Sequence, residues 1–151
     1  MSLTPAQRED ANRTDQSSPV VDVASAQAPK RILIADDNLD ILSFMQAALE
    51  GAGYDVRVAP EGAQALALQT QLGADLLITD IFMPGQDGIE TLRDCKVRFP
   101  QTRIIVMSAG GGSSRKLNYL PAAALIGADA TLRKPFNVDQ LLDAVSKVLQ
   151  G

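Results

Sequence analysis

Acidic residues follow short apolar runs at two places in the chain. Asp36 and Asp37 come directly after Arg31–Ala35, and Asp80 closes the run that begins at Leu76. Short apolar runs bounded by turn residues are typical of buried strands. If these two strands are parallel neighbours, they lie about 4.8 Å apart and their carboxyl ends meet at one edge of the sheet. Asp37 and Asp80 would then be close enough to share one cation.

Two further polar residues occupy the same kind of position. Ser108 follows the apolar stretch Arg103–Met107, and Lys134 follows Asp129–Arg133. Taken alone, each residue has an ordinary explanation as a helix cap, a turn former, a loop hydrogen-bonder or a surface lysine. The prediction of a functional site therefore depends on finding all of them at strand ends along one edge of one sheet.

The elements that must position these residues alternate between strands and helices. Strands are predicted over five short apolar stretches: Arg31–Ala35, Tyr54–Val58, the stretch before Asp80, Arg103–Met107 and Asp129–Arg133. Helices are predicted to begin after Asn38 or Asp40, over Glu61–Leu72, from Asp87 with Ile89, Leu92 and Val97 inward, over about residues 118–126, and after Asn137 with Leu141, Leu142, Val145, Val148 and Leu149 inward. This alternation indicates an α/β fold of the flavodoxin-like, doubly wound type. We expect a five-stranded parallel sheet in the order 2-1-3-4-5 with helices on both faces.

The composition restricts the possible functions. The chain of 151 residues carries a formal net charge of -4 and has scattered Lys and Arg, so no nucleic-acid partner is expected. It has no His, which excludes catalytic triads and most zinc sites. Its single Cys95 is expected to pack inside a helix, which fits a reducing, cytoplasmic setting. No apolar run reaches membrane-spanning length, so no membrane partner is expected.

The first 29 residues differ in character from the rest of the chain. They are rich in Ser, Gln, Asp, Pro and Ala and show no sustained periodicity. We expect a disordered tail over residues 1–29, with a short strand or partner-binding segment at Val20–Val23 as the alternative. A single domain is expected over residues 30–151.

The residues at the strand ends resemble those of the receiver domain of two-component response regulators. The matching motifs are Asp36-Asp37, Asp80, Met83-Pro84-Gly85 with Asp87-Gly88, Ser108-Ala109 and Lys134-Pro135-Phe136. The resemblance covers about residues 30–150 and implies that Asp80 accepts a phosphoryl group from a histidine of a partner, either a histidine kinase or a histidine phosphotransfer protein. It further implies a stand-alone, cytoplasmic regulator that is not an enzyme beyond its own phosphorylation and dephosphorylation. Such a protein would act on an unidentified downstream protein, as a monomer or a phosphorylation-dependent dimer.

The resemblance also implies a role for each matching residue. Mg²⁺, with Mn²⁺ as an alternative, would be bound by Asp37, Asp80 and the backbone carbonyl of Phe82, and by Asp36 mainly through a bound water. The metal and Lys134 would neutralise the phosphoryl oxygens, to which the Ser108 hydroxyl and the Ala109 N–H would donate. A cis peptide bond is expected between Lys134 and Pro135 and would direct the ammonium inward.

Phosphorylation is expected to change the part of the surface formed by the chain after Ser108. The added charge would draw Ser108 toward the new oxygens and move the loop at residues 110–114, together with the surface of the fourth helix, fifth strand and fifth helix. Ser108 replaces the commoner Thr of the family, and the stretch from Ser108 to Lys134 is a few residues longer than is common. Thr131 stands where many members have a Tyr or Phe that rotates on activation, so the usual coupling lacks its aromatic residue.

Two other functions compete with this interpretation. A phosphorylation-independent interaction domain would keep only the fold, and the intact acidic cluster with Lys134 argues against it. A phosphatase with an aspartyl-phosphate intermediate usually has a second Asp two residues after its nucleophile, and this chain has Phe82 there.

Overall fold

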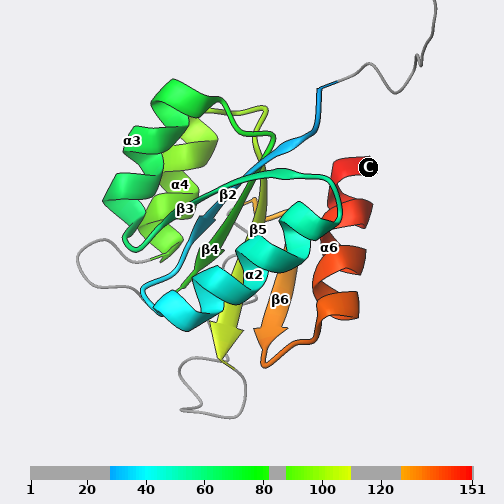
Figure 1. Ribbon diagram of the computed structural model, residues 1–151. Coiled ribbons are helices and arrows are strands. Elements are labelled where there is room, and N and C mark those ends of the chain that lie inside the picture. Colours follow the sequence, from blue (N-terminus) through cyan, green and yellow to red (C-terminus); the bar gives the residue numbers. More distant parts are fainter. Residues whose placement is uncertain (1–27, 82–87, 110–126, 151) are drawn as a thin grey trace, which may run out of the picture.

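A computed structural model of the chain describes residues 28–81, 88–109 and 127–150, built around a parallel sheet of five strands (Figure 1). The strands are β2 (Arg31–Ala35), β3 (Asp55–Ala59), β4 (Leu76–Asp80), β5 (Arg103–Ala109) and β6 (Ala130–Lys134). They lie in the order β3-β2-β4-β5-β6, which is the predicted order 2-1-3-4-5. All neighbouring pairs are parallel, as the alternation of strands and helices requires.

The register of the strands aligns their carboxyl ends along one edge of the sheet. Ala35 of β2 pairs with Thr79 of β4, so Asp36 and Asp80 both stand one position further along. Asp80 in turn pairs with Met107 of β5. The residues after Met107 pair with the end of β6, so the edge continues without interruption as far as Lys134.

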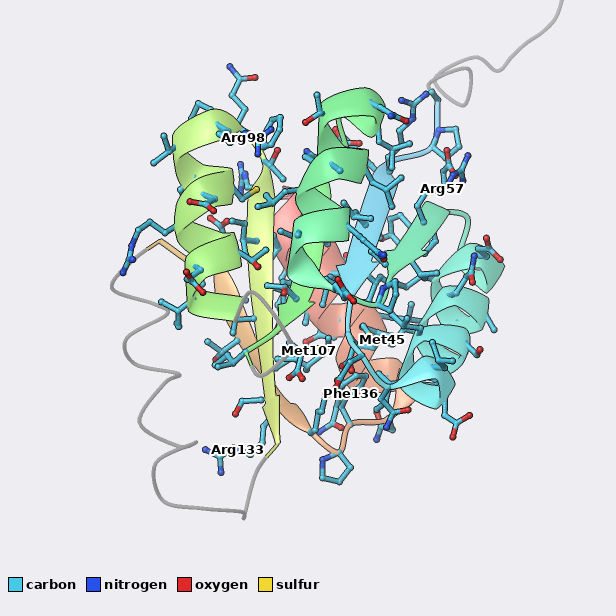
Figure 2. The ribbon with its side chains drawn as sticks, turned by 90° about the vertical axis from the view of Figure 1, so that its left-hand side faces the viewer. Met45, Arg57, Arg98, Met107, Arg133 and Phe136 are labelled. Carbon is cyan, nitrogen blue, oxygen red and sulfur yellow. The ribbon has the colours of Figure 1, made fainter. Side chains whose placement is uncertain are left out.

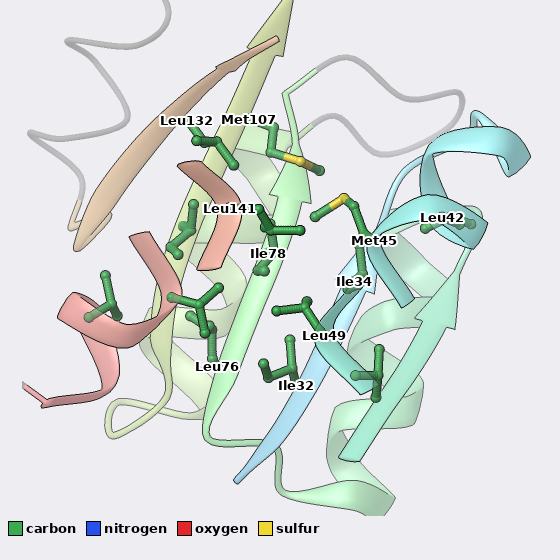
Figure 3. Close-up of a cluster of buried hydrophobic side chains, with 14 residues drawn as sticks. Ile32, Ile34, Leu42, Met45, Leu49, Leu76, Ile78, Met107, Leu132 and Leu141 are labelled. Atoms are coloured by element: carbon green, nitrogen blue, oxygen red, sulfur yellow. The ribbon is translucent and has the colours of Figure 1, made fainter. Parts of the chain in front are cut away.

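Four described helices cover the two faces of the sheet. Helices α2 (Leu39–Gly51) and α6 (Val138–Gln150) lie on one face, and α3 (Gly62–Leu72) and α4 (Gly88–Arg98) lie on the other (Figure 1). Each face has its own apolar core, and the central strand β4 contributes alternate side chains to both. Figure 3 shows the first of these cores, in which Leu42, Met45 and Leu49 of α2 and Leu141 of α6 meet the sheet.

Side-chain and glycine caps fix where the helices begin and end. The side chain of Asn38 accepts hydrogen bonds from the backbone N–H groups of Asp40 and Ile41, which makes Asn38 the N-cap of α2. Asn137 and Gln140 exchange side-chain-to-backbone hydrogen bonds at the start of α6, in the manner of a capping box. Gly73 ends α3 in the left-handed conformation, with φ of 61°.

One predicted core residue is wrong. Val97 was expected to point inward from α4, but it is 76% exposed, whereas Leu92 and Cys95 are fully buried. Leu92 and Cys95 are three residues apart and share a helix face, and Val97 follows Cys95 by two residues, which places it on the other side. Burial of Cys95 confirms that its thiol serves packing, and the same burial raises its pKa to about 11.

Two predicted strands begin one residue too early. Tyr54 precedes β3 and packs against the core instead of joining the ladder. Asp129 precedes β6. Its carboxylate accepts a hydrogen bond from the backbone N–H of Ile104, and its own backbone N–H donates to the carbonyl of Ile104. The first strand has the bounds that were predicted for it.

Several predictions fall outside the described residues. They are the tail up to residue 27, Phe82 and Met83-Pro84-Gly85, the loop at residues 110–114 and the helix at residues 118–126. Within the part of the chain that the structure describes, no helix has the length and apolar content needed to cross a membrane.

Candidate functional site

Three carboxylates meet at the carboxyl edge of the sheet. Asp36 and Asp37 follow β2, and Asp80 is the last residue of the neighbouring strand β4. One carboxylate oxygen from each lies within 4.8 Å of the others. Asp36 and Asp80 are buried and Asp37 is exposed, so the cluster opens to solvent on one side. In Figure 2 the carboxyl edge of the sheet lies in the lower half of the molecule, where Met107 and Phe136 are labelled. Arg98 is labelled near the opposite end.

Lys134 directs its ammonium into this acidic cluster. Its Nζ atom lies 2.6 Å from Asp36 Oδ2 and 3.5 Å from Asp80 Oδ1. The peptide bond to Pro135 is cis, as predicted. The predicted approach of Lys134 to Asp80 is therefore observed, although the shorter contact is to Asp36.

Both oxygens of Asp36 are already engaged by donors of the protein. Oδ1 accepts a hydrogen bond of 2.9 Å from the backbone N–H of Asn38, and Oδ2 accepts the bond from Lys134. The backbone N–H of Asp36 is bonded to the carbonyl of Ala59 on β3. This arrangement fits the indirect role expected for Asp36, because its side chain is fully buried, whereas that of Asp80 is 10% exposed and Asp37 is exposed.

Sequence reasoning missed these partners of Asp36. The spacing of Asp36 and Asn38 is that of an Asx turn, in which an aspartate accepts from the N–H two residues on, and this signal could have been used. The pairing with Lys134 has no local signal, because the two residues are 98 positions apart.

Burial makes the Asp80 carboxyl a weaker acid than usual. Loss of solvent raises its pKa, the Lys134 ammonium lowers it, and the charge of Asp36 raises it again, for a net pKa of about 6. The carboxylate is therefore costly to keep ionised while, among the described residues, Lys134 is the ammonium that faces the acidic cluster.

The donor set of the cluster fits a hard divalent cation. Carboxylate oxygens are the ligands that Mg²⁺ prefers, and Mg²⁺ usually takes one or two carboxylates and retains several waters. In the described part of the chain the three carboxylates carry more negative charge than the Lys134 ammonium offsets, and a cation held by Asp37 and Asp80 would supply the missing positive charge. The carbonyl of Phe82, which was predicted as a further ligand, lies outside the described residues.

Ser108 and Ala109 stand at the same edge on the neighbouring strand. Ser108 is fully buried, and the register pairs Ala109 with Lys134. The structure thus brings Ser108, Ala109 and Lys134 to adjacent strand ends beside Asp80, as predicted. The expected bonds from the Ser108 hydroxyl and the Ala109 N–H to a phosphoryl group stay predictions.

Comparison with protein families agrees with this geometry. A family model described as the response regulator receiver domain matches residues 32–146. The chain belongs to the response regulator receiver family. Asp36, Asp37, Asp80 and Lys134 lie together at the carboxyl edge of the sheet in this receiver domain.

Individual relatives resemble this receiver domain over most of its length. Sporulation initiation phosphotransferase F of Bacillus subtilis (strain 168) is 36% identical over 120 residues, which cover 80% of this chain and 94% of that protein. Transcriptional regulatory protein CpxR of Escherichia coli (strain K12) is 35% identical over 120 residues, but the chain spans only 49% of its length. The receiver domain therefore corresponds to nearly the whole of one relative and to about half of the other.

Solved structures show the same fold. Chemotaxis response regulator CheY4 of Vibrio cholerae superimposes with a TM-score of 0.70 at 30% identity, covering 80% of this chain and 98% of that one. A putative response regulator from Chloroflexus aurantiacus J-10-fl gives a TM-score of 0.73 at 31% identity, covering 82% of this chain and 99% of that one.

Proposed function

We propose that this receiver domain is a phosphorylation-controlled signalling module in which Asp80 accepts a phosphoryl group from a phosphohistidine of a partner protein. The observation that carries the proposal is the convergence of Lys134 Nζ, 3.5 Å from Asp80 Oδ1, with the carboxylates of Asp36 and Asp37. The partner would be a histidine kinase or a histidine phosphotransfer protein, and the relative named as a phosphotransferase is consistent with either. The domain would catalyse no reaction beyond its own phosphorylation and dephosphorylation.

In the transfer step, an oxygen of Asp80 forms a bond to phosphorus while the bond from phosphorus to the histidine nitrogen breaks. The electron pair of that bond returns to the imidazole of the partner, so the step needs no further reactant. Asp80 must be ionised to attack, and with a pKa of about 6 most of it is ionised at neutral pH. The Lys134 ammonium would shift its stronger contact from Asp36 to the arriving phosphoryl oxygens, whose charge it offsets.

Mg²⁺, or Mn²⁺ in its place, would be held by Asp37 and Asp80, with Asp36 acting through a bound water. When bound, the ion supplies positive charge that offsets the phosphoryl oxygens and removes the repulsion among the carboxylates. The residues of the chain contribute the geometry, since Asn38 and Lys134 hold Asp36 in place while Asp80 stays available at the end of β4.

The output of phosphorylation would pass through the β5–β6 side of the sheet. An aspartyl phosphate adds about 1.5 to 2 negative charges next to Ser108, which lies at the end of β5. We expect the surface of residues 118–126, β6 and α6 to change in response. Thr131 is exposed on β6. Because this residue is a threonine, the change would proceed without the rotating aromatic residue that many members carry at that position.

Phosphate labelling tests the proposed function. The purified chain is incubated with a phosphohistidine donor or with acetyl phosphate, with Mg²⁺ or with EDTA, beside an Asp80→Asn variant. We expect Mg²⁺-dependent labelling of the wild type and none of the variant. Equal labelling of both proteins would refute the site, and steady turnover of a generic phosphate ester would instead favour a phosphatase.

A further inference from the structure

Asp36 and Lys134 meet although their strands are not neighbours. Strands β4 and β5 lie between β2 and β6, so three strand spacings, about 14 Å in a flat sheet, separate the two backbones. Lys134 Nζ is nevertheless 2.6 Å from Asp36 Oδ2. The lysine side chain alone does not cross that distance, so Asp36 and Lys134 must reach toward each other along the sheet edge, and their contact depends on how the segments that follow β2 and β6 are placed.

Two aromatic rings meet between these two segments. Phe44 belongs to α2, which follows Asp36, and Phe136 follows Lys134 by two residues. Their ring centroids are 6.2 Å apart and their planes are tilted by 42°, which is within the range of a favourable aromatic contact. Phe136 also packs against the core cluster that contains Met45, and Figure 2 labels both residues in the same region.

The aromatic contact falls on the short connection that carries Lys134. On one side, Lys134 is paired with Ala109 of β5, and on the other side Asn137 is bonded to Gln140 at the start of α6. Phe136 lies between these two attachments, and its ring contacts Phe44 of α2. A substitution of Phe44 would therefore be expected to shift Phe136 and, two residues earlier, Lys134.

Core filling accounts for Phe44 only in part. Its neighbours on α2, Leu42 and Met45, are 4% and 0% exposed and fill the core, whereas Phe44 is 39% exposed. An aromatic ring kept partly in solvent contributes less burial than a core residue of the same size. Its ring contacts the ring of Phe136.

We propose that Phe44 is a positioning residue for phosphoryl transfer, which fixes the Lys134 ammonium over Asp36 and Asp80 through its contact with Phe136. This proposal rests on the proposed function of Asp80. The contact between Phe44 and Phe136 would fix the distance between the end of β2 and the end of β6.

Phosphorylation by acetyl phosphate tests the proposal without a protein partner. Phe44→Ala should slow the rate of phosphorylation about threefold to tenfold, because a displacement well below 1 Å costs less than the 10²-fold expected for a full ångström. Phe44→Tyr, which keeps the ring, should restore the rate. Leu39→Ala removes an apolar side chain that is 66% exposed on the same helix and should leave the rate unchanged. If Phe44→Ala slows transfer only from a phosphohistidine protein and not from acetyl phosphate, the ring is a docking contact and the proposal is wrong.

A double-mutant cycle identifies the route through Lys134. In a Lys134→Met background, Phe44→Ala should have no further effect on the slow residual rate, because the group that it positions is gone. An equal slowing in both backgrounds would overturn the proposal, since Phe44 would then act on the fold or on another residue.

Chemical labelling of Lys134 gives a readout that does not depend on phosphorylation. Phe44→Ala should increase the rate at which an amine-reactive reagent modifies Lys134, measured by peptide mass spectrometry, relative to Leu39→Ala. Equal modification in the two variants would overturn the proposal. A wild-type chain that acetyl phosphate does not label at all would count against the function of Asp80, and the labelling of Lys134 would still decide the role of Phe44.

Discussion

Asp80 is a buried carboxyl whose ionised form lowers the stability of the fold. It is 7% exposed and faces one ammonium at 3.5 Å, which it shares with Asp36. Its pKa of about 6 lies above the ordinary value of 3.8 mainly because of burial. The folded protein therefore holds the Asp80 proton more tightly than the unfolded chain does, and ionising Asp80 lowers the stability of the fold.

Removing the charge of Asp80 should stabilise the protein when no divalent ion is present. Between about pH 4 and pH 6 the unfolded chain has lost the proton that the folded protein keeps, so the free energy of unfolding of the wild type falls across that window. Asp80→Asn lacks this loss and should be more stable at pH 7 by about 2 to 3 kcal/mol, at 1.36 kcal/mol for each pKa unit. Urea unfolding of both proteins in EDTA measures this difference. A gap that does not shrink toward pH 4 would show that the cause is not this ionisation.

Loss of the Lys134 ammonium should have the opposite effect. Lys134→Met would leave the fully buried Asp36 without its contact of 2.6 Å, and breaking a buried ion pair on one side typically costs about 3 to 5 kcal/mol. We expect a lower free energy of unfolding in EDTA and a partial recovery when Mg²⁺ is added. Lys147→Met, which removes an exposed partner of Asp143, is the matched control and should change stability by less than about 1 kcal/mol. Equal effects of the two substitutions would contradict the structural role given to Lys134.

At the scale of elements, the start of α2 links the fold to the site. Asn38 caps this helix with its side chain and holds Asp36 with its backbone N–H. Helix formation and the orientation of one site carboxylate therefore depend on the same residue, but on different atoms of it. The two contributions can be separated by a substitution that changes only the side chain.

Asn38→Ala should weaken the helix and spare the site. The lost cap costs about 1 kcal/mol in the free energy of unfolding, and the backbone bond to Asp36 stays in place. Asn38→Ser restores a capping oxygen and should recover most of the stability. Calorimetric titration with Mg²⁺ should give similar affinities for all three proteins, and a marked loss of affinity in Asn38→Ala alone would show that the cap and the site are not separable.

The sequence predicted most of the elements because each has a strong local signal. The apolar runs before Asp36 and Asp80 and the alternation of strands with helices predict a doubly wound parallel sheet with the carboxylates at one edge, and 2-1-3-4-5 is a common order of that fold. Val97 was misplaced because α4 offers several apolar spacings, and only packing selects Leu92 and Cys95 as the inner face. The pairing of Lys134 with Asp36 could not be predicted, since it depends on how the segments after β2 and β6 approach each other across two intervening strands.

At the scale of the whole molecule, the site joins both halves of the sheet. Asp36 and Asp37 follow β2, Asp80 ends β4, and Lys134 ends β6, so a ligand bound among them contacts three strands at once. A ligand that binds the folded state and not the unfolded one raises the free energy of unfolding in proportion to the logarithm of its concentration. Ion binding at this edge should thus be measurable as global stability.

Mg²⁺ should stabilise the wild type and leave Asp80→Asn nearly unchanged. At one hundred times its dissociation constant, the ion should raise the free energy of unfolding by about 2.7 kcal/mol. Thermal unfolding at increasing Mg²⁺ concentration measures the effect, and Na⁺ at equal ionic strength controls for screening. A shift of the same size in both proteins would place the ion elsewhere on this acidic chain.

The assignment of Asp80 as phosphoacceptor is tested most directly by identifying the residue that carries the phosphoryl group. An aspartyl phosphate is reduced by borohydride to homoserine, which peptide mass spectrometry locates in the sequence. After incubation with acetyl phosphate and Mg²⁺, we predict homoserine at position 80 and its absence when EDTA replaces Mg²⁺. Homoserine at position 36 or 37, or at no position in a chain that binds Mg²⁺, would contradict the assignment of Asp80 as the phosphoacceptor.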